Sequence, residues 1–80
     1  MSAQLQEAPR IRRMVPSDLE AVVTIEREVF LFPWTQGNFS DSLDAGYHCR
    51  VLEQDGHIFG YGVMTIGAEE AHLLTLSIAP

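Results

Sequence analysis

The dipeptide Asp55-Gly56 is the feature that most limits the folds open to this chain. It separates two segments rich in apolar residues, 47–54 and 57–66. Asp-Gly between two such segments is a strong signal for a tight β-hairpin. A further apolar segment follows at 71–78 after a short turn. The second half of the chain is therefore predicted to be a three-stranded antiparallel meander.

Two glycines, Gly60 and Gly62, lie inside the second of these predicted strands. Glycine weakens a strand interior, so its presence there predicts a bulge or a close approach of another segment to the backbone. The two tyrosines of the chain, Tyr47 and Tyr61, are interpreted as aromatic residues of the sheet.

The first half of the chain follows a helical period instead of an alternating one. Its apolar residues recur at largely helical spacing and predict a helix over 17–30 with one apolar face. Two starts fit the sequence of this helix. One is a capping box formed by Ser17 and Glu20, and the other is a cap at Val15 with Pro16 as the first helical residue.

A second, shorter amphipathic helix is predicted over 36–44. Thr35 is its expected N-cap, and Trp34 and Phe39 have the spacing of a hydrophobic staple around that cap. Gly46 is expected to adopt the left-handed conformation that ends many helices. A pair of helices is therefore expected to precede the three strands.

A short strand over 10–15, with Ile11 on its inner face, completes the predicted order β-α-α-β-β-β. Strands that form one antiparallel sheet, with helices covering a face, make an α+β domain. Residues 1–9 are polar and are expected to form a flexible leader. The folded part is then expected to take in residues 10–80.

The composition narrows the classes of partner and compartment. Eleven acidic residues against five arginines and no lysine give a net charge of −6, which argues against nucleic acid as a partner. A single cysteine, Cys49, excludes a disulfide framework and favours the cytoplasm. The sequence has no apolar run of the roughly 20 residues that cross a membrane, so no membrane partner is expected.

No metal site and no catalytic thiol are predicted from this chain. His48, His57 and His72 are far apart in the sequence and lack the spacing of metal ligands. Cys49 follows a histidine directly, but neighbouring side chains on a strand point to opposite faces. The two residues are therefore not expected to act together as a nucleophile and its base.

The strand predicted over 71–78 is the most apolar segment of the sequence, and only Ala79 and Pro80 follow it. An apolar strand at the edge of a sheet favours aggregation, and native proteins usually cover such edges. We therefore expect a truncated or split domain whose missing part covers this strand. A second copy of the chain along the last strand is the alternative.

Several segments resemble the GNAT superfamily of acetyltransferases, whose domain opens with the same order of elements. The matching segments are the opening strand, the start of the first helix, the third strand and the fourth strand, at 11–14, 18–19, 58–62 and 74–80. Between them, residues 25–26, the Phe-Pro-Trp-Thr segment at 32–35 and Phe39 resemble ribosomal-protein-alanine N-acetyltransferases. The resemblance covers about half of a family domain, truncated before the loop that binds the pyrophosphate of acetyl-CoA.

The resemblance implies an enzyme that transfers acetyl from acetyl-CoA to an amine by direct attack in a ternary complex, without a metal. It implies that backbone groups of Leu76, Ser77 and Ile78 bind the pantetheine arm of acetyl-CoA as an added strand would. The family's acid and base candidates lie beyond residue 80, so no catalytic residue is assigned. The chain by itself is expected to bind acetyl-CoA poorly or not at all.

The implied acceptor is a protein N-terminus, the N-terminal alanine of a ribosomal protein. Phe32, Pro33 and Trp34 join the two helices where the family borders its acceptor groove, and they equally fit a packing anchor. Glu26 is interpreted as a buried structural carboxylate, with a contact to the acceptor amine as the alternative. A small-molecule acceptor, and a non-catalytic αβ module that pairs through its last strand, are the competing functions.

Overall fold

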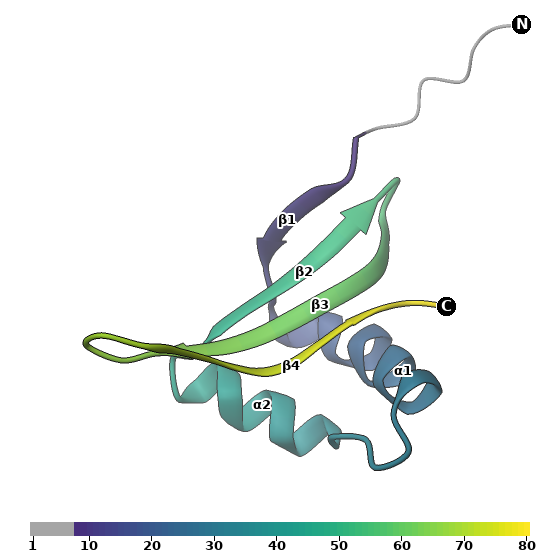
Figure 1. Cartoon of the computed structure of the whole chain (residues 1–80). Helices are drawn as coiled ribbons and strands as arrows, with labels where there is room; N and C mark the ends of the chain where they lie inside the picture. The colour runs from purple at the N-terminus through teal and green to yellow at the C-terminus, as the bar shows by residue number, and fades with distance from the viewer. Residues whose placement is uncertain (1–7) are drawn as a thin grey trace, which may run out of the picture.

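The computed structural model describes residues 8–80, which form one antiparallel sheet with both helices on the same face (Figure 1). The elements are β1 (Arg10–Arg13), the 3-10 turn η1 (Pro16–Asp18), α1 (Leu19–Val29), α2 (Gln36–Asp44), β2 (His48–Gln54), β3 (His57–Ile66) and β4 (Ala71–Ile78). The predicted α+β order β-α-α-β-β-β is confirmed. Most of the predicted leader, residues 1–7, lies outside the described residues.

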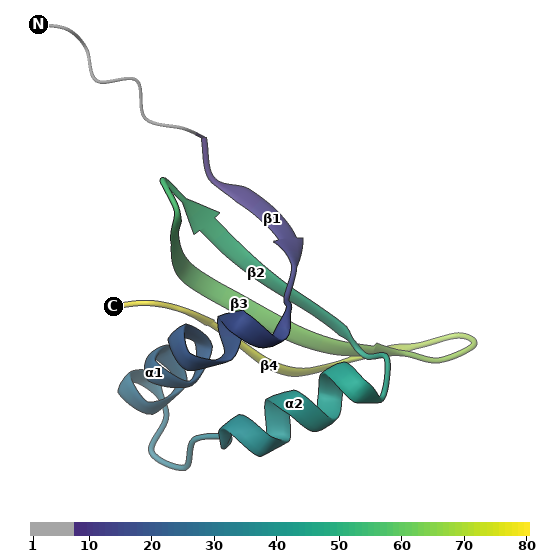
Figure 2. The ribbon, with the colours of Figure 1, turned by 180° about the vertical axis from the view of Figure 1, so that it is seen from behind.

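The four strands lie in the order β1-β2-β3-β4, and each is antiparallel to its neighbours. Asp55 and Gly56 form the turn between β2 and β3 with φ values of 53° and 80°. Positive φ at both central residues is the geometry that makes Asp-Gly favourable in a tight hairpin. The strands β1 and β4 lie at opposite edges of the sheet (Figure 2).

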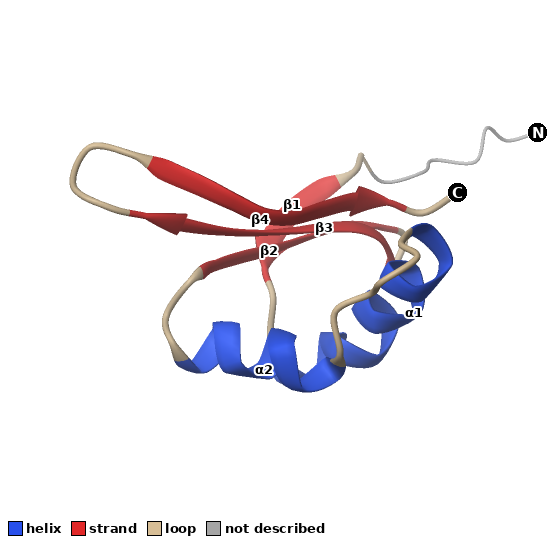
Figure 3. Ribbon diagram, turned by 60° about the horizontal axis from the view of Figure 1, so that its bottom comes forward, coloured by secondary structure: helices blue, strands red, loops and turns tan. Residues whose placement is uncertain are grey.

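The core lies between the two layers, with the strands on one side and both helices on the other (Figure 3). The apolar stripe predicted for the first helix faces the sheet and meets one residue of α2 and four of the strands. Together with Met14, which follows β1, the core residues are Leu19, Val22, Val23, Ile25, Phe39, Cys49, Val51, Tyr61 and Val63. Burial of this stripe is the main force that holds α1 on the sheet.

The first strand differs from the prediction in length and in orientation. It ends at Arg13, and Ile11 lies on the uncovered face of the sheet, where it is 71% exposed. Side chains alternate along a strand, so only one of Ile11 and Arg12 can face the helices. Arg12 takes that side because it forms an ion pair with Asp18 at the start of α1.

The start of the first helix follows the second of the two predicted possibilities. Val15 has an extended backbone, and Pro16 is the first residue of η1. The Val15 N–H donates to Asp18 Oδ2 at 2.8 Å, so Asp18 closes this turn. Ser17 lies inside η1 and caps neither η1 nor α1, so the predicted capping box of Ser17 and Glu20 is wrong.

The predicted close approach at Gly60 is confirmed. A Cβ at this position would lie 2.7 Å from Ile78 Cδ1 and 2.8 Å from Leu52 Cδ1. The pairing between β2 and β3 shifts next to it, so that Phe59 has no partner on β2. Glycine at this position lets two large side chains from neighbouring strands pack over the backbone of β3.

Candidate functional site

A groove separates the connection between α1 and α2 from the edge strand β4. Its volume is about 490 Å³. One side chain of α1, three of the residues that follow it and four residues of β4 line it: Glu26, Phe30, Phe32, Trp34, Leu73, Leu74, Thr75 and Leu76. We call it the loop–strand groove. It is the place where the segment predicted to border the acceptor meets the strand predicted to hold the cofactor.

Two of the three predicted acceptor residues line the loop–strand groove. Phe32 is 87% exposed, while Trp34 is half-buried and packs edge-on against Phe39, with 5.1 Å between ring centroids. Pro33 lies between them in sequence and is not among the lining residues. Trp34 is therefore both a packing anchor and a wall of the loop–strand groove, and its contact with an acceptor stays a prediction.

The three predicted cofactor residues occupy different positions on β4. Leu76 lines the loop–strand groove, whereas Ser77 is buried toward the helices and Ile78 is exposed. The Ala79 N–H donates to Phe59 O at 2.7 Å. Because pairing alternates along an antiparallel ladder, the backbone groups of Ser77 also face β3. Those of Leu76 and Ile78 face the open edge, where an added strand would bind.

Glu26 forms the polar floor of the loop–strand groove. The residue is only 2% exposed. Its Oε1 accepts hydrogen bonds from Tyr61 Oη at 2.5 Å and from Thr75 Oγ1 at 3.1 Å, and its Oε2 accepts one from the Trp34 N–H at 2.9 Å. A buried carboxylate is tolerated only when donors of this kind satisfy it. The interpretation of Glu26 as a buried carboxylate is confirmed.

Aromatic packing closes this hydrogen-bond network into a ring. The Trp34 ring packs on Phe39, and Phe39 packs on Tyr61 with centroids 5.6 Å apart and planes at 87°. Tyr61 then donates back to Glu26. Burial, together with the hydrogen bond to Glu26, raises the pKa of Tyr61 above its ordinary value, so the phenol remains a proton donor.

The pairing between β3 and β4 shifts register beside the groove. Val63 lies opposite Thr75, but the next residue, Met64, lies opposite Leu73. Leu74 therefore has no partner on β3, and it lines the loop–strand groove. Such irregularities redirect side chains and are frequent next to active sites.

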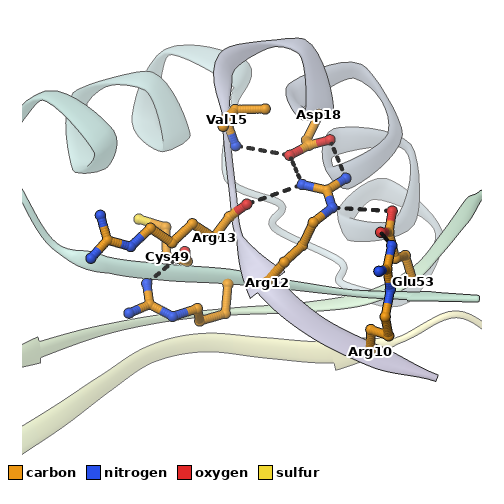
Figure 4. Close-up of polar contacts among 8 residues, drawn as sticks. Arg10, Arg12, Arg13, Val15, Asp18, Cys49 and Glu53 are labelled. Atoms are coloured by element: carbon orange, nitrogen blue, oxygen red, sulfur yellow. Dashed lines mark hydrogen bonds and ion pairs between the residues drawn. The ribbon is translucent and has the colours of Figure 1, made fainter. Parts of the chain in front are cut away.

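A separate polar cluster holds the start of α1 against β1 and β2 and shares no residue with the groove (Figure 4). Arg12 donates to both carboxylate oxygens of Asp18, at 2.9 and 3.0 Å, and lies 3.1 Å from Glu53. Arg10 binds the same Glu53 at 2.9 Å. The Arg12 guanidinium lowers the pKa of Asp18 below its ordinary value. The role of this cluster is structural, because its charges satisfy one another.

Other residues with reactive side chains are not arranged for chemistry. Cys49 is buried, and burial raises the pKa of its thiol, so the reactive thiolate is disfavoured. Residues 8–80 contain no group of three or more His, Cys, Asp or Glu side chains placed to hold a metal ion. Over the same range, no helix has the length and apolar character needed to cross a membrane.

Two known proteins similar to this chain bear the name of an N-acetyltransferase. A Bacillus subtilis protein provisionally named ribosomal protein bS18-alanine N-acetyltransferase is 35% identical over 72 residues, which are 88% of this chain and 48% of that protein. The Escherichia coli ribosomal-protein-S18-alanine N-acetyltransferase structure matches with a TM-score of 0.81 and 25% identity, covering 91% of this chain and 47% of that one.

A second solved structure, Ard1 from Thermoplasma volcanium, matches the fold with a TM-score of 0.76 and 24% identity, covering 90% of this chain and 50% of that one. No protein-family model matches the chain. The chain thus spans about half the length of the relatives that it matches.

Sequence reasoning did not single out Thr75 and assigned Tyr61 only to the sheet. Both residues reach Glu26 across 49 and 35 positions of sequence. A glutamate beside the apolar stripe of a helix was the available signal, because such a carboxylate must find donors when the helix packs. The sequence gives no indication of which strand residues supply them.

Proposed function

We propose that this chain, a GNAT-superfamily member by fold and by homology, forms the first half of an acetyl-CoA-dependent N-acetyltransferase domain. The proposed acceptor is a protein N-terminal amine, the N-terminal alanine of a ribosomal protein, since two of the similar proteins bear names of that activity. The proposed domain includes residues 10–80 and a second half that supplies the pyrophosphate loop, the acid and the base. The proposed compartment is the cytoplasm.

The proposed role of β4 is to bind the pantetheine arm of acetyl-CoA through its backbone. Leu76 and Ile78 direct their N–H and C=O groups to the open edge, so an extended ligand with amide groups fits there as an added strand. Ser77 lies between them and pairs with Tyr61 of β3, so its contribution is to hold this part of β4 on the sheet.

The proposed role of Phe32, Pro33 and Trp34 is to form one wall of the acceptor groove. Trp34 is fixed by its hydrogen bond to Glu26 and by its contact with Phe39. Phe32 is free to meet a substrate because its side chain is almost fully exposed. Pro33 restricts the backbone between them and so limits how far the two aromatic side chains can move apart.

Direct attack of the amine on the thioester is the proposed mechanism. An acetyl-enzyme linked through sulfur on this chain would need an accessible nucleophilic thiol, and the single cysteine is buried with a raised pKa. The thioester carbonyl requires a hydrogen-bond donor where negative charge develops, and the amine must lose a proton. We assign the proton transfers to the second half of the domain.

The observation that carries the proposal is the composition of the loop–strand groove. The connection that resembles the acceptor wall and the strand that resembles the cofactor strand line one groove. An amine held at Phe32 and Trp34 would therefore lie beside a thioester held at Leu76. Placing two reactants side by side is the main requirement of a direct transfer.

The test uses the complete domain, meaning this chain together with the second half that the proposal requires. It is incubated with acetyl-CoA and a peptide that begins with alanine, and the masses of the products are measured by mass spectrometry. We expect one acetyl group on the free N-terminus, and none on the same peptide with a formylated N-terminus. Acetylation of spermidine but not of the peptide would mean that the acceptor is a small-molecule amine. The absence of transfer to any amine would contradict the proposed acetyltransferase activity.

The exposed edge of β4 also supports a second candidate, a non-catalytic module that pairs with a second copy of itself. Leu73, Leu76 and Ile78 are each more than half exposed along this strand. Sedimentation of the complete domain separates the two functions. A monomer that transfers acetyl supports the enzyme, whereas an inactive dimer held through β4 supports the module.

A further inference from the structure

We propose that Glu26 is a positioning residue that sets the spacing between the acceptor wall and the cofactor strand. The inference rests on the proposed function, because it concerns the same groove. Glu26 binds both sides of the loop–strand groove with one carboxylate. Its Oε2 accepts from the Trp34 N–H at 2.9 Å, and its Oε1 accepts from Thr75 Oγ1 of β4 at 3.1 Å.

The hydrogen bond from the Trp34 N–H to Glu26 attaches the connection between the two helices to α1. Phe30 N–H still donates to Glu26 O at 3.0 Å, and Thr35 N–H donates to Asn38 Oδ1 at 2.9 Å. Between these two points, residues 31–33 make no hydrogen bond within the described chain. Position and orientation of the exposed Phe32 therefore depend on how firmly Trp34 is held.

The bond to Thr75 fixes the opposite wall at the point where β4 changes register. Thr75 directly follows Leu74, which has no partner on β3. From Thr75 to Ile78, the pairing of β4 with β3 is regular. The Thr75 side chain is buried and is directed toward the helices. Glu26 therefore holds the strand next to the irregular residue, and both Leu74 and Thr75 line the groove.

Packing alone does not explain a carboxylate at this position. A well-packed apolar residue in place of a buried charge is often neutral or stabilising, because the charge loses its hydration. The carboxylate adds directional hydrogen bonds. Its two oxygens accept from donors of three different segments at distances of 2.5 to 3.1 Å. We infer that this geometry is used to hold the two walls of the groove.

The variant Glu26→Met removes the carboxylate at nearly constant side-chain length. The thioether sulfur of methionine is only a weak acceptor, so the Trp34 N–H and the Thr75 hydroxyl both lose the group that accepts from them. The bond to the connection is lost while the side chain keeps about its size. Glu28→Met is the matched control, because Glu28 lies on the same helix and is exposed.

Two measurements on the complete domain test the inference. Amide exchange of Trp34 is expected to quicken by about 10-fold or more in Glu26→Met. The KM for the acceptor peptide is expected to rise about 10-fold while the KM for acetyl-CoA stays within about 2-fold. Glu28→Met is expected to change neither quantity. Equal behaviour of the two variants, or equal changes in both KM values, would overturn the inference.

The pair Thr75→Val and Thr75→Ser keeps the test decisive if Glu26→Met folds poorly. Valine removes the donor from the β4 side and is expected to raise the acceptor KM, and serine keeps the hydroxyl and is expected to restore it. If valine and serine behave alike, the inference is wrong. Failure of the proposed function is distinguishable, because the Trp34 exchange rate does not depend on any acetyl transfer.

Discussion

The Tyr61 phenol donates a 2.5 Å hydrogen bond to Oε1 of Glu26 and so joins β3 to α1 beneath the loop–strand groove. Trp34 and Thr75 donate to the same carboxylate. Four segments, namely α1, the connection that follows it, β3 and β4, therefore meet at one charged group. The stability of the chain and the shape of its groove are linked through this group.

Removal of the Tyr61 hydroxyl is expected to destabilise the chain. In Tyr61→Phe the buried carboxylate keeps two of its three donors, and the loss is about 1–3 kcal/mol of unfolding free energy. Urea unfolding followed by circular dichroism measures it. Tyr47→Phe is the control, because Tyr47 is 40% exposed and outside the network, and it is expected to be neutral. Equal effects from the two variants would contradict the network.

Alkaline pH is expected to destabilise the chain in two steps. The folded state raises the pKa of both Cys49 and Tyr61, and burial is the main cause for each. Above about pH 8.5 for cysteine and about pH 10 for tyrosine, the unfolded chain loses a proton that the folded chain keeps. Stability therefore falls as pH rises through these values.

Two variants test which residue causes each step in the loss of stability at alkaline pH. Cys49→Ala is expected to remove the fall that begins near pH 8.5, and Tyr61→Phe is expected to remove the one that begins near pH 10. The chain has no lysine, so no side-chain ammonium group titrates in this range. Unfolding free energy measured from pH 7 to 11 checks both. A slope that survives in both variants would point to other groups.

The elements were predictable from the sequence because their signals are local. Asp55-Gly56 places the hairpin, and the apolar period places α1 within two residues of its observed start. The orientation of Ile11 was wrong because an ion pair between Arg12 and Asp18 decides it. Tertiary partners of this kind leave no periodic pattern in the sequence.

The candidate site was predictable only in part for the same reason. The Phe-Pro-Trp segment and the last strand could be recognised by their resemblance to a family. That both would line one groove with Glu26 as its floor depends on packing between α1 and β4. Backbone alternation along β4, which separates Ser77 from Leu76 and Ile78, requires the register as well.

Acid is expected to weaken the start of α1. The Arg12 guanidinium lowers the pKa of Asp18, so the stabilisation is present above the ordinary value of about 4 and is lost as pH falls through the lower folded value. Asp18→Asn is expected to cost about 1–3 kcal/mol at pH 7 and to reduce the slope below pH 4. Asp41→Asn, at an exposed position of α2, is the neutral control. An unchanged acid slope in Asp18→Asn would contradict the assignment.

A methyl group at Gly60 is expected to disturb the sheet. In Gly60→Ala the new Cβ would lie within 3 Å of two side chains and 3.1 Å from the Ser77 carbonyl oxygen, at a cost of about 1–3 kcal/mol. Gly37→Ala is the opposite case, because its Cβ meets only Thr35 Oγ1 at 3.6 Å and the position is helical. It is expected to stabilise by about 0.5–1 kcal/mol. Thermal unfolding of the two variants measures both changes in stability. Changes of the same sign in the two variants would contradict the close approach at Gly60.

Amide hydrogen exchange along β4, measured in the complete domain with and without acetyl-CoA, tests the proposed cofactor strand most directly. The N–H groups of Leu76 and Ile78 face the open edge, and they are expected to exchange freely until acetyl-CoA protects them. Those of Ser77 and Ala79 face β3 and are expected to be protected in both states. Saturating acetyl-CoA that leaves the Leu76 and Ile78 amides unprotected would contradict the role of β4.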